Sequence, residues 1–233
     1  MTSSRTASWL QRLLPAPWAM GYPERVRASL GALFGVGVTA LISTASAGSL
    51  GGEPLLIAPI GASAVLLFAL PASPLAQPWA VIVGNLLAAV VGVTASHLIS
   101  DRLVAAPVAV AVALGLTTIF RCVHPPAGAI ALVAVLGGPK ILAMGYSFVF
   151  VPVLLNSVVL TLSALLFHLA TGHAYPHIPH GPPRPDMSVI GITPEDIDGV
   201  LAEYGDALDI SREDVDALVQ RLIARAQTRG TRR

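Results

Sequence analysis

Residues 120–140 read FRCVHPPAGAIALVAVLGGPK, an apolar stretch that begins with a histidine and two consecutive prolines. The stretch is apolar enough for a bilayer, but a proline inside a helix removes an N–H donor and clashes with the preceding turn. At the first position of a helix proline is well tolerated, because the N–H there has no intrahelical partner. The stretch therefore predicts a short helix that starts at the prolines rather than an ordinary membrane span.

The overall composition indicates an integral membrane protein. Hydrophobic residues make up 54% of the 233 residues. Charged residues make up only 12%, about half of their share in an average soluble protein. Between residues 28 and 183 the only charged side chains are Glu53, Asp101, Arg102, Arg121 and Lys140. With a net charge of +1 and no basic stripe, nucleic-acid binding is not expected, and the expected partner is a lipid bilayer.

Apolar windows of about 20 residues predict six membrane segments. Their expected bounds are residues 26–47, 54–70, 79–99, 103–120, 121–138 and 146–170. The second and the fifth are the shortest, and each has a proline near its start. An even number of segments puts both termini on one side, together with Arg5, Arg12, Arg25, Arg27, Arg121 and Arg184, against Arg102 and Lys140 on the other. The positive-inside rule therefore predicts cytoplasmic termini, in the inner membrane of a bacterium.

The two short segments belong to an internal repeat. At a spacing of 67, PIGASAVLLF matches PAGAIALVAV through Pro59, Gly61, Ala62 and Ala64 and their counterparts Pro126, Gly128, Ala129 and Ala131. Asn85 and His97 in the third segment correspond to Asn156 and His168 in the sixth, at a spacing of 71. Three segments per repeat is an odd number, so the second half crosses in the opposite sense. The expected fold is all-α, with about six transmembrane segments in a three-plus-three inverted repeat and two Pro/Gly-interrupted short spans, followed by a cytoplasmic helical tail.

A helix that starts inside the membrane points its first N–H groups and the positive end of its dipole into the protein. About 12 helical residues cover about 18 Å of a roughly 30 Å core, and about five extended residues before them cover the rest. Two such starts would bind a small anion without a buried lysine or arginine. The residues expected to bind it are Gly61, Ala62, Ser63, Asn85, His124, Pro125, Pro126, Ala127, Gly128, Ala129 and Asn156. His124 is also expected to let a proton accompany the anion, because histidine titrates near neutral pH.

Other interpretations of these residues stay open. The prolines could kink ordinary spans, and the two asparagines could simply bond between helices. His97 and His168 lie near segment ends, where they would mark membrane interfaces. The histidine-rich run could bind zinc through His168, His173, His177 and His180. The membrane segments contain no paired carboxylates, and Cys122 near His124 is the only candidate dyad, so neither an enzyme nor a cofactor or metal site is expected.

Three ordered motifs resemble the HPP family of integral membrane proteins. RCVHPPAGAIALVAVLGG contains the His-Pro-Pro that names the family, PIGASAVLLFALPASPLAQPWAVIVGN is similar to its second motif, and PVLLNSVVLTLSALLF to its last span. The resemblance covers residues 22–171. It implies the four spans usually described for the family, against the six counted here with the two short ones. It also implies anion transport, because chloroplast and cyanobacterial relatives are regarded as nitrite transporters.

The chain divides into an N-terminal interfacial segment (1–24), the transmembrane domain (25–171), a Pro-rich linker (172–190) and a cytoplasmic two-helix tail (191–233). Thr193 and Ser211 are expected to cap the two tail helices. Longer family members resemble this tail and continue into nucleotide-sensing CBS domains. The resemblance thus implies a cytoplasmic regulatory domain of that type that is absent from this chain.

Together these features predict a transporter or channel for a small monovalent anion, with nitrite first, bound near the midplane by the helix starts. The alternative is a membrane anchor or sensor that couples the tail to the membrane without transport. Gly31, Gly35 and Gly37 in the first segment favour close helix packing and a homo-oligomer.

Overall fold

A computed structural model describes residues 20–48, 56–177, 193–204 and 210–230. These residues form helices and no strands. The α-helices are α2 (Tyr22–Gly48), α3 (Pro59–Ala69), α4 (Pro78–Leu98), α5 (Arg102–Ile119), α6 (Pro125–Leu136), α7 (Gly138–Met144), α8 (Leu155–Ala170), α9 (Pro194–Tyr204) and α10 (Arg212–Gly230). A short 3-10 turn, η1 (Pro74–Ala76), precedes α4, and an irregular turn, η2 (Val149–Leu154), precedes α8. Most of the predicted N-terminal segment, most of the linker and Glu53 lie outside the described residues.

All six predicted apolar segments contain helix, but only four helices of the described chain are long and apolar enough to cross a membrane. These are α2, α4, α5 and the η2–α8 unit, and the bent pair α6–α7, with an angle of 97°, would make a fifth. The 11 residues of α3 cover about 16 Å and the 12 residues of α6 about 18 Å, well short of a roughly 30 Å core. The prediction of two short segments is confirmed, whereas six spans become four or five.

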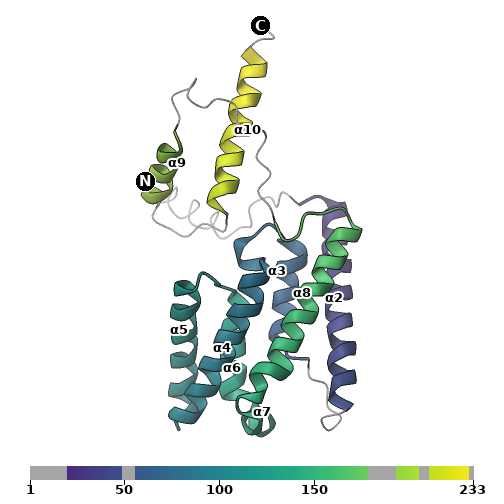
Figure 1. The fold of residues 1–233 in the computed structure, drawn as a ribbon, viewed down its shortest axis with the longest axis vertical. Helices are drawn as coiled ribbons and strands as arrows, with labels where there is room; N and C mark the ends of the chain where they lie inside the picture. Colours follow the sequence, from purple (N-terminus) through teal and green to yellow (C-terminus); the bar gives the residue numbers. More distant parts are fainter. Residues whose placement is uncertain (1–19, 49–55, 178–192, 205–209, 231–233) are drawn as a thin grey trace, which may run out of the picture.

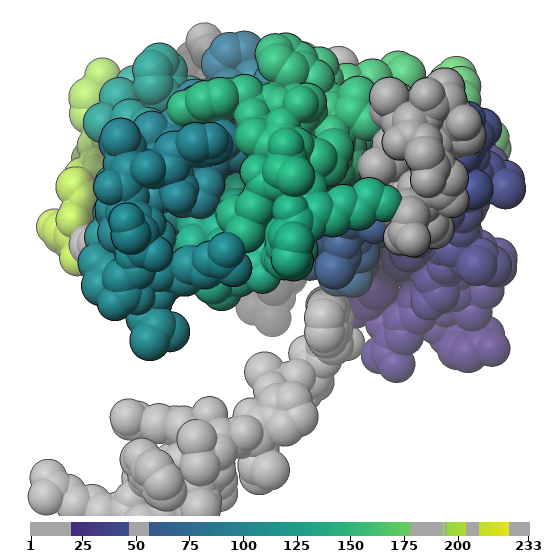
Figure 2. Space-filling model, turned by 90° about the horizontal axis from the view of Figure 1, so that it is seen from below, coloured from purple at the N-terminus to yellow at the C-terminus, as the bar shows by residue number. Residues whose placement is uncertain are grey.

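The membrane helices lie side by side, and α9 and α10 lie beyond one end of this bundle (Figure 1). Seen from the opposite end, near α7, α2 lies at one edge and α4 and α5 at the other (Figure 2). Within the bundle α2 packs against α3 and α8, while α5 packs against α6 and α4. The first helix of each predicted half therefore contacts the short helix of its own half and the long helix of the other.

Two of the glycines of α2, Gly31 and Gly35, serve packing within the chain. An added Cβ would lie 2.4 Å from Phe68 Cδ1 at Gly31 and 2.5 Å from Phe68 Cε2 at Gly35, so these glycines make the room that the ring fills. Phe68 is completely buried. Gly37 meets nothing within 4 Å, so of Gly31, Gly35 and Gly37 it alone stays free for contacts with a second copy.

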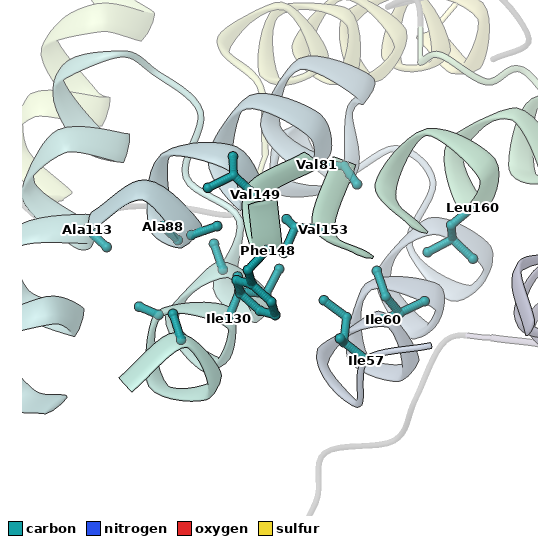
Figure 3. Packing of buried hydrophobic residues seen from close by; sticks show 14 of the residues in the cluster. Ile57, Ile60, Val81, Ala88, Ala113, Ile130, Phe148, Val149, Val153 and Leu160 are labelled. Carbon is teal, nitrogen blue, oxygen red and sulfur yellow. The ribbon is translucent and has the colours of Figure 1, made fainter. Parts of the chain in front are cut away.

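Both short helices start among buried apolar side chains. Figure 3 shows Ile57 and Ile60 together at the start of α3, and Ile130 of α6 beside Phe148. Ile60, Ile130 and Phe148 are completely buried. The proline-marked starts of α3 and α6 therefore lie inside the helix bundle.

The tail helices begin at the predicted caps. The Asp196 N–H donates to Thr193 Oγ1 at 3.4 Å, and the Asp214 N–H donates to Ser211 Oγ at 3.0 Å. These bonds satisfy backbone donors that have no partner within a helix. Both sequence predictions of capping residues are confirmed.

Candidate functional site

The short helices α3 and α6 are joined by a buried hydrogen bond between Ser63 and His124. Ser63 Oγ lies 2.8 Å from His124 Nε2, and His124 Nδ1 lies 2.8 Å from the Leu75 carbonyl oxygen. Because a carbonyl only accepts, Nδ1 carries the proton of the neutral ring and Nε2 accepts from the Ser63 hydroxyl. His124 precedes the first helical residue of α6, as predicted, and both side chains are buried.

Helix α4 lies directly against the segment that leads into α6. A Cβ added at Gly84 would lie 2.5 Å from the Cys122 carbonyl oxygen and 3.2 Å from His124 Cβ. Only a glycine allows so close an approach of the helix to another backbone. Gly84 thereby fixes the distance between α4 and His124, a role that the sequence did not reveal.

Two further polar pairs join helices in the bundle. Asn85 Nδ2 of α4 donates to Ser157 Oγ of α8 at 3.0 Å. The Ser43 hydroxyl of α2 donates to Asn156 Oδ1 of α8. All four side chains are completely buried. Both asparagines therefore bond between helices, and Asn85 Oδ1 has no hydrogen-bond partner in the described part of the chain.

The structure buries only some of the residues predicted to bind the anion. The buried members of the set are Ser63, Asn85, His124, Pro126, Ala127 and Asn156. The exposed members are Gly61, Ala62, Pro125 and Ala129, and Gly128 is half-buried. An added Cβ would meet no atom within 4 Å at Gly61 and only Val110 Cγ1, at 3.9 Å, at Gly128. The two glycines therefore have open space beside them, but neither is buried together with the polar pairs.

The first N–H groups of the short helices are bonded within the chain. The Ile60 N–H donates to the Ile57 carbonyl at 3.1 Å, and the Gly61 N–H donates to the Ala58 carbonyl at 3.0 Å. The Ala127 N–H donates to the His124 carbonyl at 2.8 Å. Pro59, Pro125 and Pro126 have no N–H to offer. Fewer backbone donors than expected therefore remain for a ligand at these starts.

A charged cluster caps the far end of α3. Arg27 Nη2 donates to the Phe68 carbonyl at 3.2 Å, and Arg27 also bonds Glu24. His168 Nε2 donates to the Leu67 carbonyl at 2.9 Å, while His168 Nδ1 lies 3.3 Å from Arg27 Nη1. These side chains satisfy carbonyls that a helix end leaves unpaired. His168 is completely buried within this cluster, in the last turn of α8, and its expected place near a membrane interface stays a prediction.

The η1 segment connects the His124 pair to the tail. Its Leu75 carbonyl accepts from His124, and its Ala76 carbonyl accepts a hydrogen bond from the Tyr175 hydroxyl at 2.9 Å. Burial raises the pKa of the Tyr175 phenol. The His177 N–H donates to the Gln77 side chain at 3.0 Å, and His177 Nε2 lies 2.8 Å from Asp214 Oδ1 of α10. These four contacts run from α10 through η1 to the start of α6.

The histidines of the proposed zinc run have separate partners. His173 lies 3.4 Å from Glu24, and His177 bonds Asp214, while His168 bonds the end of α3. His180 lies outside the described residues. No group of three metal-binding side chains occurs in the described ranges.

The contact between His177 and Asp214 is expected to weaken in acid. Burial opposes ionisation of Asp214, but hydrogen bonds from His177 and Ser211 outweigh it and lower the pKa of its carboxyl. A lowered pKa stabilises the docked tail above the usual Asp value of about 3.9, and this stabilisation is lost as the pH falls through the lower value. The protection factors of the α10 amides against hydrogen exchange should therefore fall at low pH. Asp214→Asn should remove this pH response and Glu213→Gln, an exposed neighbour, should keep it; a response unchanged in Asp214→Asn would contradict the assignment.

Comparison with known proteins identifies the transmembrane part of the chain. Residues 17–176 match the protein-family model described as HPP, transmembrane region. Transmembrane protein DDB_G0269096 of Dictyostelium discoideum is 38% identical over 127 residues, which cover 52% of this chain and 44% of that protein. Transmembrane protein DDB_G0273707/DDB_G0273361 of the same organism is 35% identical over 126 residues, 52% of this chain and 40% of that protein. The chain thus spans less than half the length of these relatives, and no solved structure matches it.

Proposed function

The chain belongs to the HPP transmembrane region family of multi-pass integral membrane proteins, and from this premise we propose that it transports a small monovalent anion, as a carrier or a channel. Nitrite is the first candidate, because the motifs around His124 resemble those of relatives regarded as nitrite transporters. The proposal assigns the chain no enzymatic activity.

The observation that carries the proposal is the pair of short helices whose starts lie inside the bundle. Interrupted helices that begin near the midplane mark the substrate sites of many transporters built from inverted repeats. The neighbours of α2 and α5 support such a repeat, with α3 and α6 as the interrupted spans. Ser63 follows the first turn of α3 and His124 directly precedes α6, so their hydrogen bond joins the regions where the two short helices begin.

Buried polar pairs on five helices support a path through the bundle. They link α2 with α8 through Ser43 and Asn156, α4 with α8 through Asn85 and Ser157, and α3 with α6 through Ser63 and His124. Polar side chains inside a membrane bundle are costly and commonly mark substrate pathways. We place the substrate along these pairs.

In the proposed orientation both termini lie on the cytoplasmic side of a bacterial inner membrane. Arg102 and Lys140, both exposed, are then outside. In a Cys122→Ala background, Arg102→Cys and Lys140→Cys should react with an impermeant thiol reagent added from outside intact cells. Reaction of position 140 only after the cytoplasmic side is opened would contradict the orientation.

Uptake into proteoliposomes tests the function directly. Vesicles with the full chain should take up nitrite faster than protein-free vesicles, in a screen that includes nitrate, formate, chloride and bicarbonate.

A second candidate function, a membrane anchor or sensor for a regulatory tail, is favoured by the contact between His177 and Asp214. It expects no flux of any anion and a binding partner for the tail.

A further inference from the structure

We propose that the substrate occupies the buried polar pairs as a small weak acid that carries its proton, rather than as a bare anion. The inference deepens the proposed function and rests on it. It names the substrate class by the chemistry of the side chains around Ser63, Asn85 and His124.

The side chains of these pairs bear no fixed charge. Ser63, Asn85 and Ser157 are neutral, and the contacts of His124 are those of a neutral ring. The guanidinium of Arg27 lies at the far end of α3, where it is bound to Glu24 and to the Phe68 carbonyl. A bare anion would give up its hydration here without meeting a counter-charge, whereas a neutral acid would not.

Backbone donors do not make up for the missing charge. The N–H groups of Ile60, Gly61 and Ala127 already bond carbonyls of the preceding turn, and the prolines at both starts have none. A bare anion binds through donors, so few backbone partners are left for it at these helix starts.

One buried acceptor, by contrast, calls for a ligand that donates. Asn85 Oδ1 is completely buried and has no hydrogen-bond partner in the described residues. A buried acceptor without a donor is destabilising, and the hydroxyl of a protonated acid would supply one. Asn85 directly follows Gly84, the residue that packs against His124, so this acceptor lies on the part of α4 that adjoins the α3–α6 pair.

The amide of Asn85 also suits the acid once it has lost its proton. Its partner, the Ser157 hydroxyl, can either accept from Nδ2 or donate to Oδ1. The amide can therefore turn over without losing this bond and then present its N–H groups to the anion. A side chain with both functions fits a substrate that changes between acid and conjugate base.

His124 is the group that takes the proton. The Ser63 hydroxyl passes its proton to His124 Nε2 and accepts the proton of the acid, which leaves an anion, an imidazolium ring and an unchanged serine. The Pro59 carbonyl, 3.4 Å from Ser63 Oγ, is the acceptor toward which this hydroxyl turns when Nε2 is protonated. His124 otherwise faces the Leu75 carbonyl and Gly84, and the titratable and charged groups of its own segment are Cys122 and Arg121, whose side chain is exposed.

A comparison of weak and strong acids tests the inference. Proteoliposomes with a trapped pH dye receive nitrite or formate, whose acids are weak, or nitrate or chloride, whose acids are strong. Protein-free vesicles give the rate of unassisted acid permeation. Nitrite and formate should enter faster than this rate, with acidification of the lumen and without response to an imposed membrane potential, and nitrate and chloride should not enter.

The possible failures separate the inference from the function on which it rests. Entry of nitrate as fast as nitrite, or potential-driven nitrite entry without acidification, would overturn the weak-acid inference and leave anion transport standing. No protein-dependent flux of any of the four would overturn both.

A variant of the buried acceptor gives an independent test. Asn85→Leu keeps a similar volume but removes the acceptor, so nitrite uptake should fall by about tenfold or more. Thr94→Val is the matched control, because the Thr94 hydroxyl on the same helix bonds the Val90 carbonyl and Tyr146 instead. If Asn85→Leu does not fold, Ser157→Ala, which removes the partner of the amide, takes its place. Wild-type uptake by a folded Asn85→Leu or Ser157→Ala variant would contradict the role of Asn85.

Discussion

Gly84→Leu is expected to abolish uptake, because α4 has no room for a side chain where it meets the segment before α6. The first atom of the new side chain would lie 2.5 Å from the Cys122 carbonyl oxygen, a backbone atom that can move only with the chain around it. It would also press on His124 Cβ at 3.2 Å. Overpacking of this kind costs about 1–3 kcal/mol or more of stability, and it would shift His124 from Ser63.

Gly115→Leu is the control for Gly84→Leu, since its added Cβ meets nothing within 4 Å. It should fold and transport as the wild type does, as judged by size-exclusion chromatography in detergent and by nitrite uptake. Gly61 and Gly128, the glycines expected to bind the anion, have no such close contact, so the spacing argument applies to Gly84 and not to them. Normal uptake by Gly84→Leu would show that His124 does not need this spacing.

His124→Gln should fold but should lose most uptake and its dependence on pH. A glutamine amide can still donate toward the Leu75 carbonyl and accept from Ser63, but it cannot take up a proton in this range. In the wild type, protonation of the ring favours a bound anion, and by linkage the anion favours protonation. At a fixed concentration of the protonated acid, however, a ring that is already protonated cannot take the proton of the acid, so uptake by the wild type should fall as the pH falls.

The fixed acid concentration removes the effect of pH on the substrate, so that any remaining slope belongs to the protein. The variant is expected to show no slope under these conditions. His124→Ala, which leaves the buried Leu75 carbonyl without a donor, should also lose stability, by about 1–3 kcal/mol. If His124→Gln keeps the pH profile of the wild type, His124 is structural and the proton is carried elsewhere.

Local signals in the sequence predicted the elements of this fold well. Helices α3 and α6 begin with the prolines Pro59 and Pro125, as the tolerance of a first helical position for proline requires. Thr193 and Ser211 cap the tail helices, because capping depends on residues only three positions apart. His124 was also expected just before a helix start, but its hydrogen-bond partners were not predicted.

Contacts between distant segments could not be read in the same way. The Leu75 carbonyl that bonds His124 is a backbone group, and a backbone group leaves no mark in a sequence. Gly84 differs in its environment, not in its pattern, from the many other glycines of the chain. The same holds for His168, which lies near a helix end in the sequence but is enclosed by Arg27 and α3 in the fold.

The number of free N–H groups at the starts of the short helices differs from the expectation that the repeat suggested. Free N–H groups were expected at both short helices, but the first turn of each bonds carbonyls of the residues just before it, including those of Ala58 and His124. Turns of this tight kind are common at helix ends and are not coded by a distinct residue pattern. The ligand is therefore assigned here to side chains rather than to backbone donors.

The most direct test of the account is nitrite uptake by proteoliposomes that contain the wild type or Ser63→Ala. Ser63 loses only its hydroxyl in this variant, which removes the bond to His124 Nε2 and changes little volume at a completely buried position. We predict protein-dependent uptake by the wild type, a loss of about tenfold or more in Ser63→Ala, and wild-type uptake in Thr94→Val. Equal uptake by the wild type and Ser63→Ala, or by the wild type and protein-free vesicles, would contradict this prediction.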